Sequence, residues 1–272
     1  MFSFAQTNLQ LLHQLCCADY TDNDLDVIAK AYRLATRLFT GYFRGSGKTS
    51  IAHLVGTASI LASVAAPIEV ITAGLLHAAY EFGDFGDGVR GISKHKRQSV
   101  RRVVGEVTEN YVAQYMALRW NESTILEFSR NLEGLSKTES YLLLIRLANE
   151  LEDHLDRGIL YCENVEKRLH YLKNCGDLMT EMAINLGFPT LAQEMSQVFT
   201  ANLSTTITSE IKSDHAYSYL IPTTPYIKRL IGQLHYRVSP RFEQLFAIFA
   251  ITGTVKHESS QSSDIGENSY TR

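Results

Sequence analysis

Apolar side chains recur along most of this chain with the spacing of α-helices, and no run alternates for long like a half-buried strand. One stripe of apolar residues runs from Leu25 to Phe39 at helical spacing. Gly41 and the cluster from Gly45 to Gly47 follow it. Because glycines interrupt helices, we expect a turn after residue 39. The pattern predicts an all-α fold, a bundle of helices.

Local signals place the ends of several further helices. Ser136 and Glu139 have the spacing of a capping box, in which each residue satisfies a free amide at the helix start. Gly187 suits a left-handed C-cap, and Pro189 suits the first turn of another helix. The stretch 68–82 carries few charges, so it should be central and buried. The expected helices cover residues 49–64, 68–82, 137–154, 165–186 and 189–203.

The polarity of the chain divides it into three parts. We expect a helical domain over residues 1–203, because residues 204–214 are rich in serine and threonine and form a plausible boundary. A C-terminal extension over 204–255 should contain two short helices, at 225–236 and 240–251. Residues 256–272 are too polar to bury a core, so they are predicted to be a disordered tail.

Composition excludes several classes of protein. Hydrophobic residues make up 45% of the chain and charged residues 20%, which is ordinary for a globular protein. A net charge of −3 provides no basic field for nucleic acid or an anionic membrane surface. The apolar run 245–251 is far shorter than the ~20 residues of a membrane helix, and the N-terminus lacks a signal-peptide pattern. We expect a cytoplasmic protein.

Two motifs that suggest known chemistry do not satisfy its requirements. The four cysteines contain no C-x-x-C pair, so a zinc ribbon or a thioredoxin-type site is excluded. We expect all four to be free and structural, with Cys16 and Cys17 inside an apolar helical pattern. Gly45-Ser-Gly-Lys-Thr49 looks like the end of a phosphate-binding loop. That loop needs a glycine at position 42, which is Tyr42, and a preceding strand where a helix is expected here.

Three segments carry a resemblance to a known family. They read F-R-G-S-G-K-T-S-I-A-H (43–53), A-G-L-L-H-A-A-Y-E (73–81) and L-L-L-I-R-L-A-N-E-L-E-D (142–153). This arrangement is similar to the HD superfamily, and most closely to the hydrolase domain of the stringent-response guanosine tetraphosphate synthetase/hydrolase family. The similarity extends over residues 31–199 and stops before any nucleotide-synthesising domain. It implies an HD-type helical bundle with a short helical C-terminal extension.

The resemblance also implies roles for individual residues. His53, His77 and Asn149 fall at metal-ligand positions, and Glu81 falls at the first of two acidic positions that activate water. Arg44 and Ser46 match substrate-contacting residues, and Asp153 also falls at such a position. The chain departs from the family pattern at positions where the family has acidic ligands or bases. Its aspartates are replaced by Ala78 and Asn149, and its second acidic residue by Phe82.

These departures change what the site could bind. Carboxylates provide most of the electrostatic attraction for Mn²⁺ or Mg²⁺, whereas two imidazoles and an amide favour zinc or copper. The family's arginine, histidine and asparagine are replaced by Glu150, Glu152 and Asp153, so the local charge disfavours a polyphosphate unless a cation intervenes.

Simpler interpretations stay open beside this one. Each histidine could be a satisfied core imidazole, and the three acidic residues could form a solvated helix face. Alternatively Asp153, or Asp84 or Asp87 from the glycine-rich loop, could rebuild a metal site.

The leading hypothesis is a divergent HD-domain protein with a degenerate metal site. It would act as a non-catalytic module that binds a nucleotide or another small anionic or phosphorylated ligand, or as an interaction module. The alternative is a metal-dependent phosphohydrolase that acts on such a ligand through a rebuilt site. Any cofactor would be a divalent ion such as Mn²⁺ or Zn²⁺, held weakly. An HD-fold oxygenase with two irons would need more histidines and aspartates in register than the chain offers.

Overall fold

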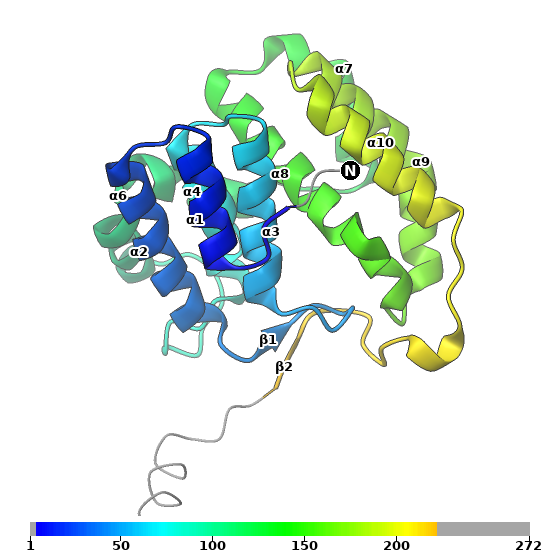
Figure 1. Ribbon diagram of the computed structural model, residues 1–272, viewed down its shortest axis with the longest axis horizontal. Helices are drawn as coiled ribbons and strands as arrows, with labels where there is room; N and C mark the ends of the chain where they lie inside the picture. Colours follow the sequence, from blue (N-terminus) through cyan, green and yellow to red (C-terminus); the bar gives the residue numbers. More distant parts are fainter. Residues whose placement is uncertain (1–3, 222–272) are drawn as a thin grey trace, which may run out of the picture. The chain divides into compact units, whose positions relative to one another are not determined.

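The computed structural model describes residues 4–221, and their regular structure is almost entirely helical. The predicted all-α class is confirmed (Figure 1). The predicted helices at 225–236 and 240–251 and the predicted tail 256–272 lie outside the described residues. The α-helices are α1 Asn8–Cys17, α2 Asp22–Phe39, α3 Ser50–Ser63, α4 Ile68–Leu76, α5 Ala79–Phe82, α6 Lys94–Ala117, α7 Glu122–Arg130, α8 Lys137–His154, α9 Val165–Asn185 and α10 Pro189–Leu203. Short 3₁₀ helices occupy Leu132–Gly134, Leu155–Tyr161 and Ser209–Ile211.

Helices α3, α4 and α8 form the centre of the domain. Nearly every residue of α3 is buried, and α3 packs against both α4 and α8 (Figure 1). Helix α8 is buried along most of its length, including its polar C-terminal half. Helices α9 and α10 pack along each other beside α8. Side chains on α3 and α8 therefore face one another across a dry interface.

Several end signals read from the sequence are confirmed. The Ser136 side chain accepts a hydrogen bond from the Glu139 amide, and the Glu139 side chain accepts from the Ser136 amide. Gly187 adopts φ +88° after α9, and Pro189 begins α10. Helices α6 and α7 were not assigned from the sequence. Gly105, with φ +83°, divides α6 into two helical parts.

The single helix predicted over 68–82 is wrong in one respect that matters for the site. Helix α4 ends at Leu76, and α5 begins only at Ala79. Ala78 has ψ near 3°, which does not continue the helix. The prediction of burial is confirmed, since α4 is buried from Val70 onward. The interruption places His77 at the junction of two helices.

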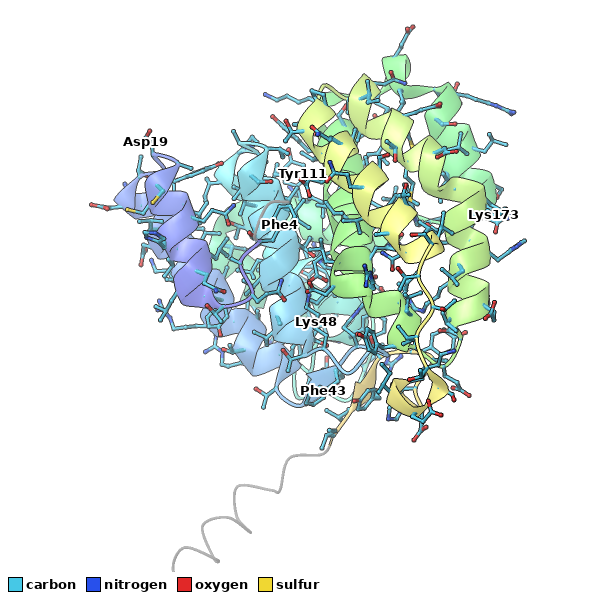
Figure 2. All side chains as sticks on the ribbon, turned by 45° about the vertical axis from the view of Figure 1, so that its right-hand side comes forward. Phe4, Asp19, Phe43, Lys48, Tyr111 and Lys173 are labelled. Atoms are coloured by element: carbon cyan, nitrogen blue, oxygen red, sulfur yellow. The ribbon has the colours of Figure 1, made fainter. Side chains whose placement is uncertain are left out.

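A two-stranded antiparallel sheet joins distant parts of the chain. Strand β1, Tyr42–Phe43, pairs with β2, Tyr219–Leu220. Figure 2 shows Phe43 and Lys48 close to the end of α3 at which the strands meet. The Ser213 amide also donates to the Tyr161 carbonyl at 2.7 Å. The segment that follows α10 thus returns to the helical domain, and the division at residue 203 stays a prediction.

The cysteine prediction is partly wrong. All four thiols are free, and Cys162 and Cys175 are buried. Cys16 and Cys17, which the apolar pattern placed inside, are exposed. In α1 the buried positions are Leu11 and Leu15, so the two cysteines follow on the solvent side of the last turn.

Candidate functional site

A cavity of about 400 Å³ opens between the turn after β1, the α4–α5 junction and the C-terminal half of α8. Helix α9 and the segment before β2 contribute further walls through Arg168 and Tyr217. Six of the seven residues proposed from the sequence line this cavity: Arg44, Ser46, His77, Glu81, Asn149 and Asp153. His53 does not line it, but the centroid of its ring lies 5.4 Å from that of His77.

The two histidines are buried, and each uses its Nδ1 in a hydrogen bond. The Nδ1–H of His77 donates to the Gly74 carbonyl at 2.7 Å, which leaves Nε2 with its lone pair. The Nδ1–H of His53 faces the Glu152 carboxylate, and His53 Nε2 has no partner. Burial, followed by the proximity of His53, lowers the pKa of His77 to about 3. His77 is therefore neutral at physiological pH, as a metal-binding imidazole must be.

Asn149 adds an unsatisfied acceptor to this region. It lies on α8, it is buried, and its Oδ1 has no hydrogen-bond partner among residues 4–221. Buried acceptors without donors are uncommon in folded proteins, so this grouping fits a ligand that is electron-poor. Ala78, beside His77, lines the cavity but offers no ligand atom. Two imidazole nitrogens and one amide oxygen match a zinc-like ion better than Mn²⁺ or Mg²⁺.

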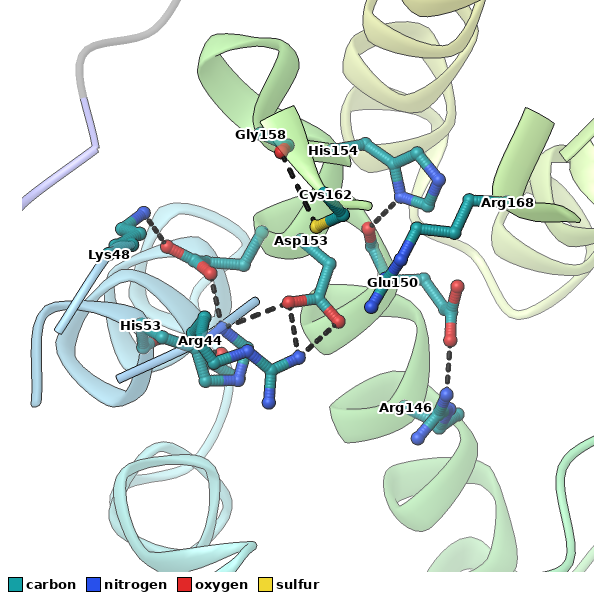
Figure 3. A network of polar contacts seen from close by, with 12 residues as sticks. Arg44, Lys48, His53, Arg146, Glu150, Asp153, His154, Gly158, Cys162 and Arg168 are labelled. Atoms are coloured by element: carbon teal, nitrogen blue, oxygen red, sulfur yellow. Dashed lines mark hydrogen bonds and ion pairs between the residues drawn. The ribbon is translucent and has the colours of Figure 1, made fainter. Parts of the chain in front are cut away.

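A second grouping of possible ligands lies on the other side of His53. His53 Nδ1 and oxygens of Glu152 and Asp153 lie within 4.8 Å of one another. These carboxylates already have cationic partners, however: Lys48 pairs with Glu152 and Arg44 with Asp153 (Figure 3). A cation at this point would have to displace both pairs, so the Nε2 side is the better candidate. Asp84 and Asp87 are engaged within their own loop and do not line the cavity.

Arg44 is the best-anchored cation of the cavity. One of its terminal nitrogens lies 2.5 Å and 2.6 Å from the two oxygens of Asp153. Burial disfavours the charged guanidinium, but Asp153 outweighs this and raises the pKa of Arg44. Burial also opposes the charge on Asp153, and Arg44 and then His53 outweigh it and hold its pKa well below the usual range. Both side chains are therefore charged at neutral pH.

The cavity is also lined by two arginines that were not predicted from the sequence, Arg146 and Arg168. Arg146 pairs with Glu150, and its guanidinium lies 5.2 Å from the centroid of the Trp120 ring. Arg168 donates to Asn164 Oδ1 at 2.9 Å and to the Ala216 carbonyl at 3.1 Å. It forms no ion pair with a carboxylate within residues 4–221. Its positive charge is available to a ligand.

The interpretation of Glu150, Glu152 and Asp153 as a solvated acidic face is wrong. Glu150 and Glu152 are only 4% and 2% exposed, and Asp153 is partly buried. All three carboxylates are paired, with Arg146, Lys48 and Arg44 respectively. Helix α8 is covered by α3 on one side and α9 and α10 on another, so its polar end is an internal ion-pair network. The expected local negative charge is neutralised.

The turn between β1 and α3 is not built as a phosphate-binding loop. The Arg44 amide donates to the Lys48 carbonyl at 2.7 Å, and Gly47 takes φ +86° inside the turn. Thr49 caps α3 by accepting from the Ala52 amide. A two-residue strand leads into the turn, where the sequence predicted a helix. The Lys48 side chain points to Glu152, not to an open anion site.

Glu81 and Ser46 line the cavity without a strong partner of their own. Glu81 is exposed and forms no ion pair with other residues of the described part of the chain. Its neighbour Phe82 also lines the cavity and lies 5.8 Å, centroid to guanidinium carbon, from Arg90. A single carboxylate therefore stands at this rim.

Comparisons with known proteins match one family model and two relatives. A family model described as a domain of unknown function (DUF6817) matches residues 36–119. A GTP pyrophosphokinase of Streptomyces antibioticus is 26% identical over 184 residues, which are 68% of this chain and 21% of that protein. A GTP pyrophosphokinase of Streptomyces coelicolor is 25% identical over 187 residues, 68% of this chain and 20% of that protein.

The chain spans about a fifth of the length of these curated relatives. Among the described residues, no helix has the length and apolar character needed to cross a membrane. The described part of the chain is all-α. Over about two thirds of its length, the chain is distantly similar to part of the GTP pyrophosphokinases.

Proposed function

We propose that the cavity binds a small phosphorylated ligand, a nucleotide or a related anion, without hydrolysing it. The observation that carries this proposal is the convergence of Arg44, Arg146 and Arg168 on one cavity. Arginine suits phosphate because its planar fork donates several hydrogen bonds at once. Arg168 forms no direct ion pair with a carboxylate of the described residues, so an anion would gain most there.

The similarity to GTP pyrophosphokinases supports a nucleotide-related ligand. We further propose that the scaffold is a divergent HD-type bundle whose metal site is degenerate. Ala78 and Asn149 stand where two aspartates would be expected, and Phe82 stands where a second acidic residue would be expected. Without these carboxylates the cavity keeps its anion-binding groups and loses most of the attraction for Mn²⁺.

The proposal is tested by calorimetric titration of the full chain with guanosine and adenosine nucleotides, pyrophosphate and the unphosphorylated nucleosides. We expect the phosphorylated compounds to bind and the nucleosides to fail. Arg44→Ala and Arg168→Ala should each weaken binding by about 1–3 kcal/mol, the scale of a hydrogen bond to a charged group. Arg33→Ala, at an exposed position on α2 outside the cavity, is the matched control. Equal affinities of all four proteins would refute the cavity as the binding site.

A second function, metal-dependent phosphohydrolysis through a rebuilt site, is favoured by one specific observation. Within residues 4–221, His53 Nε2 and Asn149 Oδ1 are buried without a hydrogen-bond partner, and His77, whose Nδ1 is used by a backbone carbonyl, lies beside His53. These residues would hold a divalent ion, which would polarise a phosphate and lower the pKa of a bound water. Glu81 would accept a proton from that water, and Arg44, Ser46 and Asp153 would orient the phosphorylated substrate. Manganese- or zinc-dependent release of phosphate, abolished by His53→Ala, would establish this function in place of the first.

A further inference from the structure

Lys48, which is partly exposed, contacts the buried Glu152, and Glu152 contacts His53. Each oxygen of the Glu152 carboxylate has one partner: Oε1 accepts from Lys48 Nζ, and Oε2 accepts from His53 Nδ1. His53 and Glu152 are only 1% and 2% exposed, so this contact is dry. An ionised carboxylate is stable in such a place only when its charge is paired and its lone pairs are used.

The neighbouring ion pair approaches the same imidazole. Asp153 Oδ1, which pairs with Arg44, lies 3.4 Å from His53 Nδ1. The turn from Arg44 to Lys48 thus holds two consecutive carboxylates of α8, one with each of its terminal residues. Both carboxylates face the Nδ1 side of His53, so only the opposite nitrogen, Nε2, is left for a ligand.

The Glu152 side chain packs against α3 at Gly56, where there is no side chain. A Cβ atom added at Gly56 would lie 2.5 Å from Glu152 Oε1 and 2.8 Å from its Cγ. Gly56 is three residues after His53, so the two positions share one face of α3. The carboxylate therefore reaches Nδ1 because residue 56 has no side chain.

From these contacts we propose that Glu152, held by Lys48, is a positioning residue for His53. It fixes the ring with the proton on Nδ1 and the lone pair on Nε2, directed away from the carboxylates. A carboxylate behind a histidine is a common device that orients a metal-binding imidazole and strengthens its nitrogen as a ligand. Neither Lys48 nor Glu152 lines the cavity, so each would act on a ligand there only through another residue. The effect of Glu152 on metal binding rests on the proposed metal-dependent function. The positioning of the His53 ring does not.

The ring tautomer tests the proposal without any ligand. Long-range ¹H–¹⁵N correlation spectra of the full chain at pH 7.5 should show His53 protonated at Nδ1, with His53→Gln identifying its signals. Glu152→Leu and Gly56→Ala should both shift His53 toward the other tautomer or a mixture. Glu152→Gln should keep the Nδ1–H form, because an amide oxygen can still accept. His77 is an internal control, since its Nδ1–H is held by a backbone carbonyl in every variant.

Gly134→Ala is the control for glycine replacement, because an added Cβ there meets nothing within 4 Å. Zinc affinity, measured by competition with a chromophoric chelator, provides a second readout. Glu152→Leu should weaken it about 10–100-fold, the usual effect of losing such a partner, and Lys48→Met by a smaller factor. A wild-type chain that binds no zinc would remove the metal-dependent function, while the tautomers would still decide the role of Glu152. An Nε2–H tautomer in the wild type, or no change in Glu152→Leu, would overturn the proposal.

Discussion

Arg44 contacts both oxygens of Asp153 with one terminal nitrogen, at 2.5 Å and 2.6 Å. In the usual fork-to-fork pair two nitrogens would be used, one for each oxygen. The end-on arrangement leaves the other guanidinium donors of Arg44 free of the carboxylate. Because Arg44 lines the cavity, the same residue is anchored by an internal anion and open to an external one.

Asp153→Asn is expected to strengthen anion binding. The substitution removes the charge that neutralises Arg44 and keeps an oxygen that can accept from it. We expect pyrophosphate to bind about tenfold more tightly, or about 1.4 kcal/mol, in calorimetric titration at fixed ionic strength. Asp26→Asn is the control, since Asp26 pairs with Lys30 on the exposed face of α2 and changes the net charge equally. Weaker binding in Asp153→Asn alone would show that Asp153 supports the ligand instead of competing with it.

The unmodified protein should not hydrolyse guanosine tetraphosphate with manganese at the rate expected of an intact HD site. Ala78 and Asn149 supply no carboxylate beside the two histidines, and Phe82 leaves Glu81 as a single acidic group. Each lost ligand or base costs several kcal/mol of transition-state stabilisation, and ~1.4 kcal/mol is already tenfold in rate. The measurement is phosphate release, with and without Mn²⁺. The double variant Ala78→Asp/Asn149→Asp should bind Mn²⁺ more tightly than the wild type, and robust wild-type turnover would contradict the expectation.

Acid stability should depend on Glu109, a fully buried carboxylate on α6 outside the cavity. It accepts from Arg97, Arg101 and the Tyr80 hydroxyl at 2.6–2.9 Å. Burial raises the pKa of Glu109, but Arg97, Arg101 and Tyr80 outweigh it, and the net pKa is lowered from 4.5. A carboxylate with a depressed native pKa stabilises the fold above its unfolded pKa. That contribution is lost as the pH falls from about 4.5 toward the native value.

Urea unfolding at several pH values tests this dependence. Glu109→Gln should lower the free energy of unfolding at pH 7 by about 1–3 kcal/mol, because two partly exposed arginines lose a charged acceptor. It should also flatten the dependence on pH below 4.5. Glu106→Gln is the control, since Glu106 meets Arg101 at an exposed site and its loss should cost less than about 1 kcal/mol. Equal acid dependence of wild type and Glu109→Gln would exclude this carboxylate as the cause.

Gly83→Ala should destabilise the wall of the cavity that carries Glu81. Gly83 ends α5, and an added methyl would overlap the Ala79 carbonyl, which is backbone and cannot swing away. We expect a loss of about 1–3 kcal/mol, the usual cost of overpacking, seen as a lower midpoint in thermal unfolding. Gly134→Ala, where a methyl meets open space, should leave the midpoint unchanged. A stable Gly83→Ala protein would mean that α5 can shift as a unit.

Much of the fold could be predicted because its signals are local. The capping box of Ser136 and Glu139 and the left-handed Gly187 depend on residues a few positions apart. The low charge of residues 68–82 likewise predicted the burial of α4. The break at Ala78 could not be seen, because apolar residues continue through it at helical spacing. Helix α6 also escaped, since its charges and Gly105 obscure the period.

The contacts of the site were harder to predict because they join residues far apart in the sequence. Lys48 belonged to a motif that the sequence excluded as a phosphate-binding loop, so its side chain had no assigned partner. That partner, Glu152, lies 104 residues away and was read as part of a solvated face. Arg146 was given no role although it lies in a segment that carries the resemblance, and Arg168 lies outside the three segments; both became site residues because α8 and α9 bring them to one cavity. Tertiary pairing of charges leaves little trace in a single sequence.

The separation along the chain between the turn at residues 44–48 and the end of α8 has a kinetic consequence. The two ion pairs between this turn and α8 join residues that are 109 and 104 positions apart. Closing so long a loop costs entropy that a few charged contacts repay only after the helices have packed. We therefore expect the cavity to be completed late in folding and the turn to be among the first parts to detach on unfolding. A ligand that touches both the turn and α8 would slow that detachment, so its binding would be measurable as a longer lifetime of the native state.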